Sequence, residues 1–205
     1  MVMIHHSDTL CEDRWPELAA ALRNGTCAVL LAPQPVMMAP ARGIVAATIN
    51  LMVREARGLV CHAMTAARML EAGLPLIPST GQQPDAWRFA VSYEAGSGCS
   101  TGISAEDRAR TMNAGAAERV WPGDIATPGH IMPVLGDPDG PSAMTHAPSA
   151  ALRIMRLAGV SGGAAICTIL DADGAVADIG TAAALASRLG LCAVRPDEVS
   201  SMDPG

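Results

Sequence analysis

The sequence predicts a single α+β domain in which short apolar strands alternate with amphipathic helices. Three observations lead to this prediction: the chain has 205 residues, half of them are apolar, and helical and strand periodicities follow one another without a linker or an internal repeat. A chain of this length and apolarity can bury a sizeable core. We therefore expect one domain over residues 15–199, with a flexible N-terminal tail at 1–14 and a frayed C-terminal tail at 200–205.

Helices are predicted where apolar residues recur at helical spacing between terminal signals. Pro16 suits a first helical turn, Asn24 and Gly25 end the first helix, and Ser104 can cap the helix that follows it. The predicted helices cover residues 15–24, 43–55, 65–72, 104–117, 150–157 and 181–189. Apolar or alternating runs predict strands at residues 27–31, 58–61, 88–94, 164–170 and 192–194.

Composition excludes several classes of function. A net charge of −6 and few aromatic residues argue against a nucleic-acid partner or an anionic membrane. No apolar run approaches the length of a membrane span. The chain has no lysine, which excludes Schiff-base chemistry on a lysine. Its six cysteines are scattered and no secretory signal is evident, so we expect reduced thiols, a cytoplasmic location and no bound cofactor.

The segment 99–134 is the part that reads as a working site. Pro128 and Gly129 form a turn signal, and we expect them to hold His130 in a rigid loop between apolar segments. A histidine in such a place can carry protons. The alternative is that His130 only hydrogen-bonds a backbone carbonyl.

This segment also carries a family resemblance. The run STGISAEDR at 100–108, the spacing to Pro122 and Asp124, and PGHIMP at 128–133 together resemble the 3,4-dihydroxy-2-butanone 4-phosphate synthases, riboflavin-pathway lyases that act on ribulose 5-phosphate. The likeness extends from about residue 18 to residue 199. It implies a mixed central sheet covered by helices, and a homodimer whose clefts lie near the subunit interface.

Three residues are candidates for catalysis: His130, Cys61 and Glu94. The resemblance places Cys61 where the family has a cysteine beside its substrate, so its thiol is either a nucleophile or proton donor, or a buried structural thiol. Glu94 ends a predicted strand and points either into the cleft or into solvent.

Substrate-binding groups are expected in the hydroxyls and polar side chains around the inferred site. The candidates are Ser100, Thr101, Ser104, Asp107, Thr145, His146 and Thr168. The polar segment 78–84 takes the place of the family's substrate-covering loop.

The sequence departs from the family at the positions that carry charge. The family's acidic, magnesium-binding loop corresponds here to residues 32–36, which include no carboxylate. Its phosphate-binding arginine becomes Met144, its metal-binding histidine becomes Ala147, and its late catalytic glutamate becomes Thr168. We therefore expect no metal site.

From these losses the sequence predicts a divergent, metal-independent enzyme of specialised metabolism. It would enolise a pentulose-like or other carbonyl substrate and condense it with a β-keto acyl thioester, delivered by an acyl carrier protein in one version, to form a butenolide or furanone. Two alternatives remain open: a catalytically silent homologue that binds a ligand or partner, and a genuine 3,4-dihydroxy-2-butanone 4-phosphate synthase.

Overall fold

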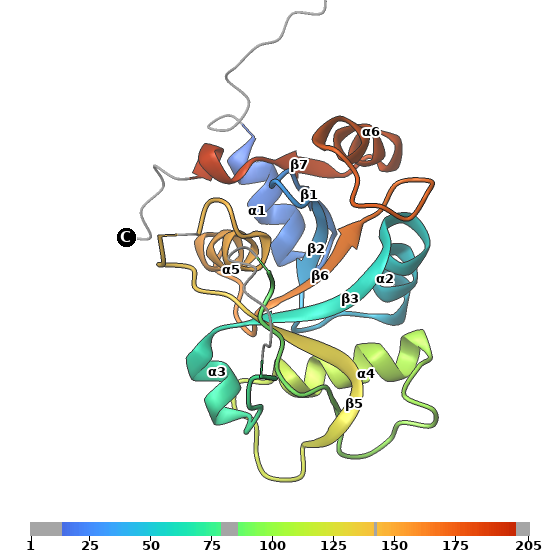
Figure 1. Cartoon of the computed structure of the whole chain (residues 1–205), viewed down its shortest axis with the longest axis vertical. Helices are drawn as coiled ribbons and strands as arrows, with labels where there is room; N and C mark the ends of the chain where they lie inside the picture. The colour runs from blue at the N-terminus through green and yellow to red at the C-terminus, as the bar shows by residue number, and fades with distance from the viewer. Residues whose placement is uncertain (1–13, 79–85, 142, 200–205) are drawn as a thin grey trace, which may run out of the picture.

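A seven-stranded mixed sheet organises the described part of the chain (Figure 1). The computed structural model describes residues 14–78, 86–141 and 143–199. Within them the strand order is β4-β5-β3-β6-β2-β1-β7. The pairs β3–β5 and β1–β7 are parallel and the other pairs are antiparallel. The predicted α+β fold with a mixed, helix-covered sheet is therefore confirmed.

The elements follow the chain in alternating order. The strands are β1 (Ala28–Leu30), β2 (Val36–Pro40), β3 (Arg57–Met64), β4 (Tyr93–Ala95), β5 (Ile125–Leu135), β6 (Ala164–Ile169) and β7 (Cys192–Val194). The α-helices are α1 (Trp15–Arg23), α2 (Ala46–Leu51), α3 (Ala66–Glu71), α4 (Ala105–Gly115), α5 (Ala147–Leu157) and α6 (Ile179–Leu189). A π-helix, η1 (Met52–Ala56), follows α2, and a short 3₁₀ helix, η2 (Pro196–Val199), follows β7.

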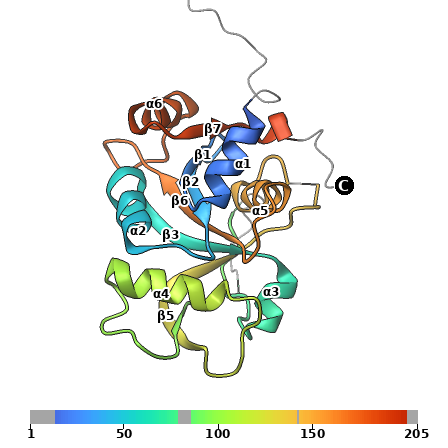
Figure 2. The same cartoon turned by 180° about the vertical axis from the view of Figure 1, so that it is seen from behind.

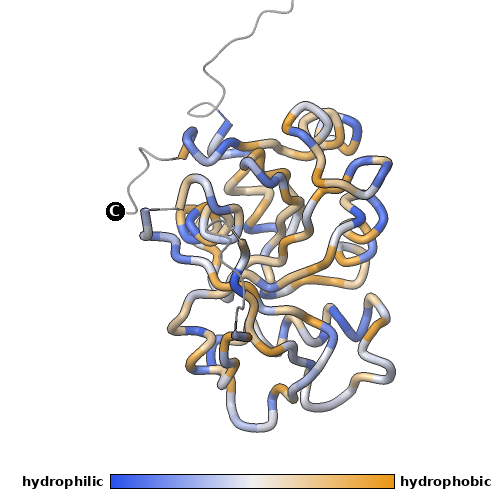
Figure 3. Tube along the Cα trace, in the orientation of Figure 1, coloured by the Kyte–Doolittle hydropathy of each residue, from blue (hydrophilic) through white to orange (hydrophobic). Residues whose placement is uncertain are grey.

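Side chains alternate across the sheet and form two apolar cores, one on each face. In β6, Ala165 and Cys167 face the first core, whereas Ala164 and Ile166 face the second. Helices α2, α4 and α6 contribute to the first core, and α1 and α5 contribute to the second (Figures 1 and 2). Figure 3 shows apolar segments running along the central strands. The sheet is thus covered on both faces.

One buried hydrogen-bonded group joins three separate parts of the fold. His62 in β3 is fully buried; its Nδ1 lies 2.7 Å from the Tyr93 hydroxyl and its Nε2 lies 2.8 Å from the Gly162 carbonyl oxygen. Because a carbonyl can only accept, Nε2 donates to Gly162 and Nδ1 accepts from Tyr93. Burial lowers the pKa of His62 to about 4, although the bond to Gly162 acts in the opposite direction. The imidazole is therefore neutral in the folded protein at neutral pH.

Two strands differ from the sequence prediction. The residues around His130, which were expected to form a loop, lie within β5. The pairing of β5 with β4 shifts register there: Tyr93 pairs with Ile131 but Glu94 pairs with Ala126. Pro128, which cannot donate a ladder hydrogen bond, falls inside that shift. The run 36–40 was not predicted as a strand, yet it forms β2. All five of its residues are buried between β1 and β6, so it shows no polar alternation.

Other boundaries also moved. The predicted helix 43–55 is split into α2 and the π-helix η1. The predicted helix 150–157 begins earlier, at Ala147, because Pro148 fits a first helical turn. The predicted strand 88–94 shrinks to β4, with an isolated bridge from Phe89 to Val134.

Several expectations fall largely or wholly outside the described ranges. Both predicted tails lie there except for Arg14, and so does the segment 79–85 that holds most of the predicted substrate-covering loop. None of the helices in the described ranges has both the length and the apolarity to cross a bilayer.

We predict that His62 makes folding stability depend on pH between about 6.5 and 4. The unfolded chain binds a proton on His62 near pH 6.5, whereas the folded chain does so near pH 4, so stability is lost as pH falls through this window. The full effect is on the order of 3 kcal/mol. Denaturant titrations of wild type and His62→Gln should show a flatter profile for the variant above pH 4.5. If the free energy of unfolding changed equally with pH in the two proteins, this account would be contradicted.

Candidate active site

His130 and Glu94 form a pair at the β4–β5 end of the sheet. Nδ1 of His130 lies 3.3 Å from Oε2 of Glu94. The two side chains are 44% and 20% exposed, so a ligand can reach the imidazole while the carboxylate is largely covered. With Nδ1 donating to the carboxylate, Nε2 is left to accept a proton. The structure therefore brings two of the three predicted catalytic residues together.

Two glycines allow this pairing. At Gly129, a Cβ would overlap the backbone of Tyr93 and Glu94, so only glycine lets β5 approach β4 here. At Gly102, whose φ is +75°, a Cβ would overlap Oε1 of Glu94 and Nδ1 of His130. That Oε1 atom is buried, and it has no hydrogen-bond partner among the described residues. The backbone of Gly102 thus packs directly against the side chains of Glu94 and His130.

Asp107 holds Gly102 in place. Its carboxylate accepts hydrogen bonds from the Ser100 amide (3.2 Å), the Ser100 hydroxyl (2.9 Å) and the Gly102 amide (3.1 Å). Its own amide donates to Ser104, which caps α4 as predicted. Burial opposes ionisation of Asp107, but these hydrogen bonds outweigh it and lower its pKa. An ionised Asp107 therefore fixes the loop beside the His130–Glu94 pair.

Four predicted substrate-binding residues lie in or next to this loop. The hydrogen bonds described above join Ser100, Ser104 and Asp107 to one another and to Gly102. These three side chains therefore stabilise the conformation of the loop. Thr101 is exposed, and its hydroxyl accepts from the Ile103 amide at 3.4 Å. Thr101 therefore has no hydrogen bond to the Asp107 carboxylate, which organises the rest of the loop.

Cys61 lies elsewhere, inside β3 and the second core. Its side chain is buried and its Sγ lies 3.6 Å from the Leu59 carbonyl oxygen. Burial, with a smaller effect of Cys167, raises the pKa of the Cys61 thiol to about 12. A thiol that stays protonated is a poor nucleophile. The geometry therefore favours the structural interpretation of Cys61 over the catalytic one.

The last three predicted substrate-binding residues lie around α5 and β6. His146 is the N-cap residue of α5, and its Nδ1 lies 2.8 Å from the Ser149 hydroxyl. Thr145 precedes it and is exposed. Thr168 is partly buried in β6, opposite Val36 of β2. The structure places these residues on other elements than the His130–Glu94 pair.

Several positions where the resembled family carries charge are apolar here and lie in or against one core of the sheet, whereas Gln34 and Thr168 are polar. Ala32, Val36 and Ala147 are members of the second core, together with Cys61, and Met144 packs against it. An isolated charge at any of these positions would be desolvated without a partner. Within the described ranges no three His, Cys, Asp or Glu side chains are grouped so that they could hold a metal ion.

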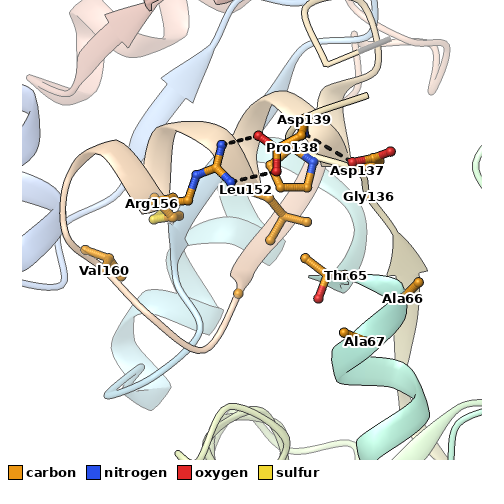
Figure 4. A pocket seen from close by; sticks show the side chains of 12 residues that line it. Thr65, Ala66, Ala67, Gly136, Asp137, Pro138, Asp139, Leu152, Arg156 and Val160 are labelled. Carbon is orange, nitrogen blue, oxygen red and sulfur yellow. Dashed lines mark hydrogen bonds and ion pairs between the residues drawn. The ribbon is translucent and has the colours of Figure 1, made fainter. Parts of the chain in front are cut away.

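A hollow of about 430 Å³ between α3, α5 and the segment after β5 was not anticipated from the sequence (Figure 4). Figure 4 shows Arg156 in a two-pronged ion pair with Asp139, at 2.6 and 2.8 Å, along one wall. Thr65 and Leu152 line the hollow as well. Because the carboxylate of Asp139 already engages the Arg156 guanidinium and Asp137 adds a second carboxylate to the lining, this hollow does not offer a free positive charge to a phosphate.

Comparison with known proteins identifies the family to which this chain belongs. A family model described as 3,4-dihydroxy-2-butanone 4-phosphate synthase matches residues 17–201. The chain belongs to this family. The 3,4-dihydroxy-2-butanone 4-phosphate synthase of Pseudomonas aeruginosa is 43% identical over 129 residues, which cover 63% of this chain and 35% of that protein. The synthase of Chlorobium limicola is 34% identical over 166 residues, covering 78% of this chain and 74% of that protein. This chain thus spans about a third of the first relative's length.

Solved synthase structures agree with the fold. RibBX, a two-domain synthase from A. baumannii, superposes with a TM-score of 0.82 at 30% identity, covering 91% of this chain and 56% of that one. A synthase in complex with two magnesium ions superposes with a TM-score of 0.81 at 26% identity, covering 90% of this chain and 93% of that one.

These comparisons overturn the predicted function. We expected a metal-independent condensing enzyme of natural product metabolism, forming a butenolide or furanone. The relatives are instead named for the synthase, and a further one, from Synechocystis, for riboflavin biosynthesis. The expectation of metal independence falls with it, because one solved synthase holds magnesium. The loss of charged residues is real, but it was too narrow a basis for assigning a new reaction.

The described residues do not fit a magnesium site of the expected kind. Magnesium prefers oxygen ligands, and the aligned positions 32–36 and Ala147 offer no side-chain oxygen except the amide of Gln34. Thr168, at the place of the family's late glutamate, contributes a hydroxyl in place of a carboxylate. These positions therefore lack the carboxylate ligands on which a magnesium-dependent step would depend.

We predict that Gly102→Ala separates His130 from Glu94. The new Cβ cannot fit between them, so nitrogen-15 and proton NMR signals of the His130 ring should change. The loss of stability should exceed that of Gly25→Ala by about 1–3 kcal/mol. Gly25 has a similar φ of +77° but nothing within 4 Å of its added Cβ, which makes it a matched control for backbone strain. Unchanged His130 signals in Gly102→Ala would disprove the packing argument.

Proposed function

We propose that this chain is a 3,4-dihydroxy-2-butanone 4-phosphate synthase of the riboflavin pathway, acting on ribulose 5-phosphate. One observation carries the proposal: the family match covers residues 17–201, including the segment that builds the His130–Glu94 pair. The chain spans only part of some relatives, so the activity is inferred for the matched domain.

The pair suits the first chemical demand of this reaction, which is proton transfer next to a carbonyl. Enolisation removes a proton from the carbon beside the ketone, and Nε2 of the 44% exposed His130 side chain is the ring nitrogen left to accept it when Nδ1 donates to Glu94. The resulting imidazolium would be stabilised by the Glu94 carboxylate 3.3 Å from Nδ1. Asp107 would act indirectly, by holding Gly102 against this pair. The later dehydration, rearrangement and loss of formate need further proton transfers to which His130 can contribute.

We also propose a homodimer in the cytoplasm. The homodimer is what the resemblance to the synthase family implies, and Ile103, next to Gly102 in the chain and 61% exposed, is available to a second subunit. The described cysteines are free, which suits a reducing compartment.

A second candidate is a homologue that binds a ligand without turning it over. The observation that favours it is the apolar character of Ala32, Val36, Met144 and Ala147 in and against the second core. If the reaction requires charge at these positions, binding at the remaining polar groups could persist while catalysis is lost.

We expect wild type to release formate from ribulose 5-phosphate in the presence of magnesium, and His130→Gln to be roughly 10²–10⁴-fold slower because it removes the proton acceptor. Glu94→Gln should be impaired less, because it keeps a hydrogen-bonding oxygen. Arg14→Gln, on the exposed start of α1, is the control and should be unaffected. A coupled formate assay measures all four proteins.

The same assay decides between the two candidates. Saturable binding of ribulose 5-phosphate without formate would replace the synthase by the binding homologue. Absence of both binding and formate would reject both.

A further inference from the structure

A second hollow, of about 370 Å³, opens between the π-helix η1, the end of β6 and α6. Three arginines line it, Arg54, Arg57 and Arg188, together with the carboxylates Glu55 and Asp171. Helix α6 contributes to the first core, whereas Cys61 and Ala147 belong to the second. This hollow is therefore separate from Cys61 and Ala147, and from the His130–Glu94 pair at the β4–β5 end of the sheet.

The charges around this hollow are unevenly compensated. Glu55 accepts one hydrogen bond from Arg54 Nε and one from Arg188, each at 2.8 Å. Both guanidinium groups carry five N–H donors, so each has donors in addition to the one that Glu55 uses. Arg57 donates to the Ala172 carbonyl at 3.2 Å, which is not a charged partner. Asp171 accepts from the amides of Asp173 and Ala175 in its own turn. The lining thus has an excess of positive charge on an acidic chain.

The backbone that presents these arginines is unusual. Arg54 and Glu55 lie in the π-helix η1, a form that is rare and is found frequently at functional sites. Arg57 follows with φ of +70°, and among the described residues it is the only non-glycine with positive φ. A glycine would adopt this conformation at lower cost. The fold therefore keeps a guanidinium where backbone stability alone would favour glycine.

We propose that this hollow binds a small phosphate-bearing anion through Arg54, Arg57 and Arg188. Guanidinium groups bind phosphate oxygens through paired, charge-assisted hydrogen bonds. Glu55 holds two of these side chains in place, as a carboxylate between two arginines does in a preorganised site. The volume suits a diphosphate group or a small sugar phosphate. This site does not depend on the synthase activity.

Arg57→Gly is the sharpest test, because glycine suits the backbone at this position. Calorimetric titration of the full chain with inorganic diphosphate, at constant ionic strength and without divalent ions, should show saturable binding. Arg57→Gly should weaken it roughly tenfold to a hundredfold while thermal stability stays equal or rises. Arg188→Gln should weaken it as well. Arg14→Gln, a remote exposed arginine, and His130→Gln, in the candidate active site, should bind diphosphate as wild type does.

The outcomes separate the explanations. No saturable binding by wild type, or unchanged binding by Arg57→Gly and Arg188→Gln, would overturn the proposal. Equal weakening by Arg14→Gln would also overturn it, because the attraction would then be a general effect of charge. If binding is confirmed, titrations with ribose 5-phosphate and adenosine 5′-diphosphate will show which source of the phosphate group binds more tightly. Diphosphate binding without formate release would support this site and reject only the synthase activity.

Discussion

Burial of the sheet on both faces is the constraint on which the rest of this structure depends. Each strand residue near the centre must face one of two apolar cores, and a charge there would be desolvated without a partner. His62 meets this constraint by staying neutral and by pairing both ring nitrogens, with Tyr93 and Gly162. Cys61 meets it by staying protonated. Groups that must change charge during a reaction are therefore confined to the end of the sheet and to loops.

The His130–Glu94 pair follows from this confinement. At the β4–β5 end the strands are no longer covered in the same way, and a register shift lets His130 stand beside Glu94 with its imidazole exposed. Two local contacts then position the pair. Asp107 accepts a hydrogen bond from the amide of Gly102, and Gly102, which has no Cβ, leaves room for the two side chains. None of these contacts is strong alone, but each removes a freedom that an edge loop would otherwise have. The geometry of this loop therefore depends on the buried, ionised carboxylate of Asp107.

Most of the fold could be predicted from the sequence, because hydrophobic periodicity indicates helices and strands, and capping residues such as Ser104 indicate helix ends. Strand β2 was missed because a strand buried on both faces has no alternation, and Pro128 and Gly129 were predicted to form a loop because a register shift has no local signal. For the candidate site, the sequence singled out His130 and Glu94, and the structure brings them within 3.3 Å of each other. Gly102 was not singled out, because its importance lies in what a Cβ would touch. Thr145, His146 and Thr168 were grouped with His130 by resemblance, but they lie on other elements.

The chain belongs to the synthase family, yet several positions that are charged in the resembled family are apolar here. The two findings are compatible, because one concerns the scaffold and the other concerns a few side chains. The family match covers residues 17–201 and so records the scaffold as a whole, which apolar alternation, glycines at tight contacts and helix caps determine. The chemistry depends on a handful of side chains whose replacement by alanine, valine or methionine costs the scaffold nothing, since apolar residues suit a core better than desolvated charge. A scaffold can thus be retained at high structural similarity while charged side chains at such positions are absent. In this chain three arginines, Arg54, Arg57 and Arg188, line an open hollow beside η1, on the face of the sheet that carries the first core. The location of charge, and not the degree of likeness, is therefore the property that governs what the protein can bind.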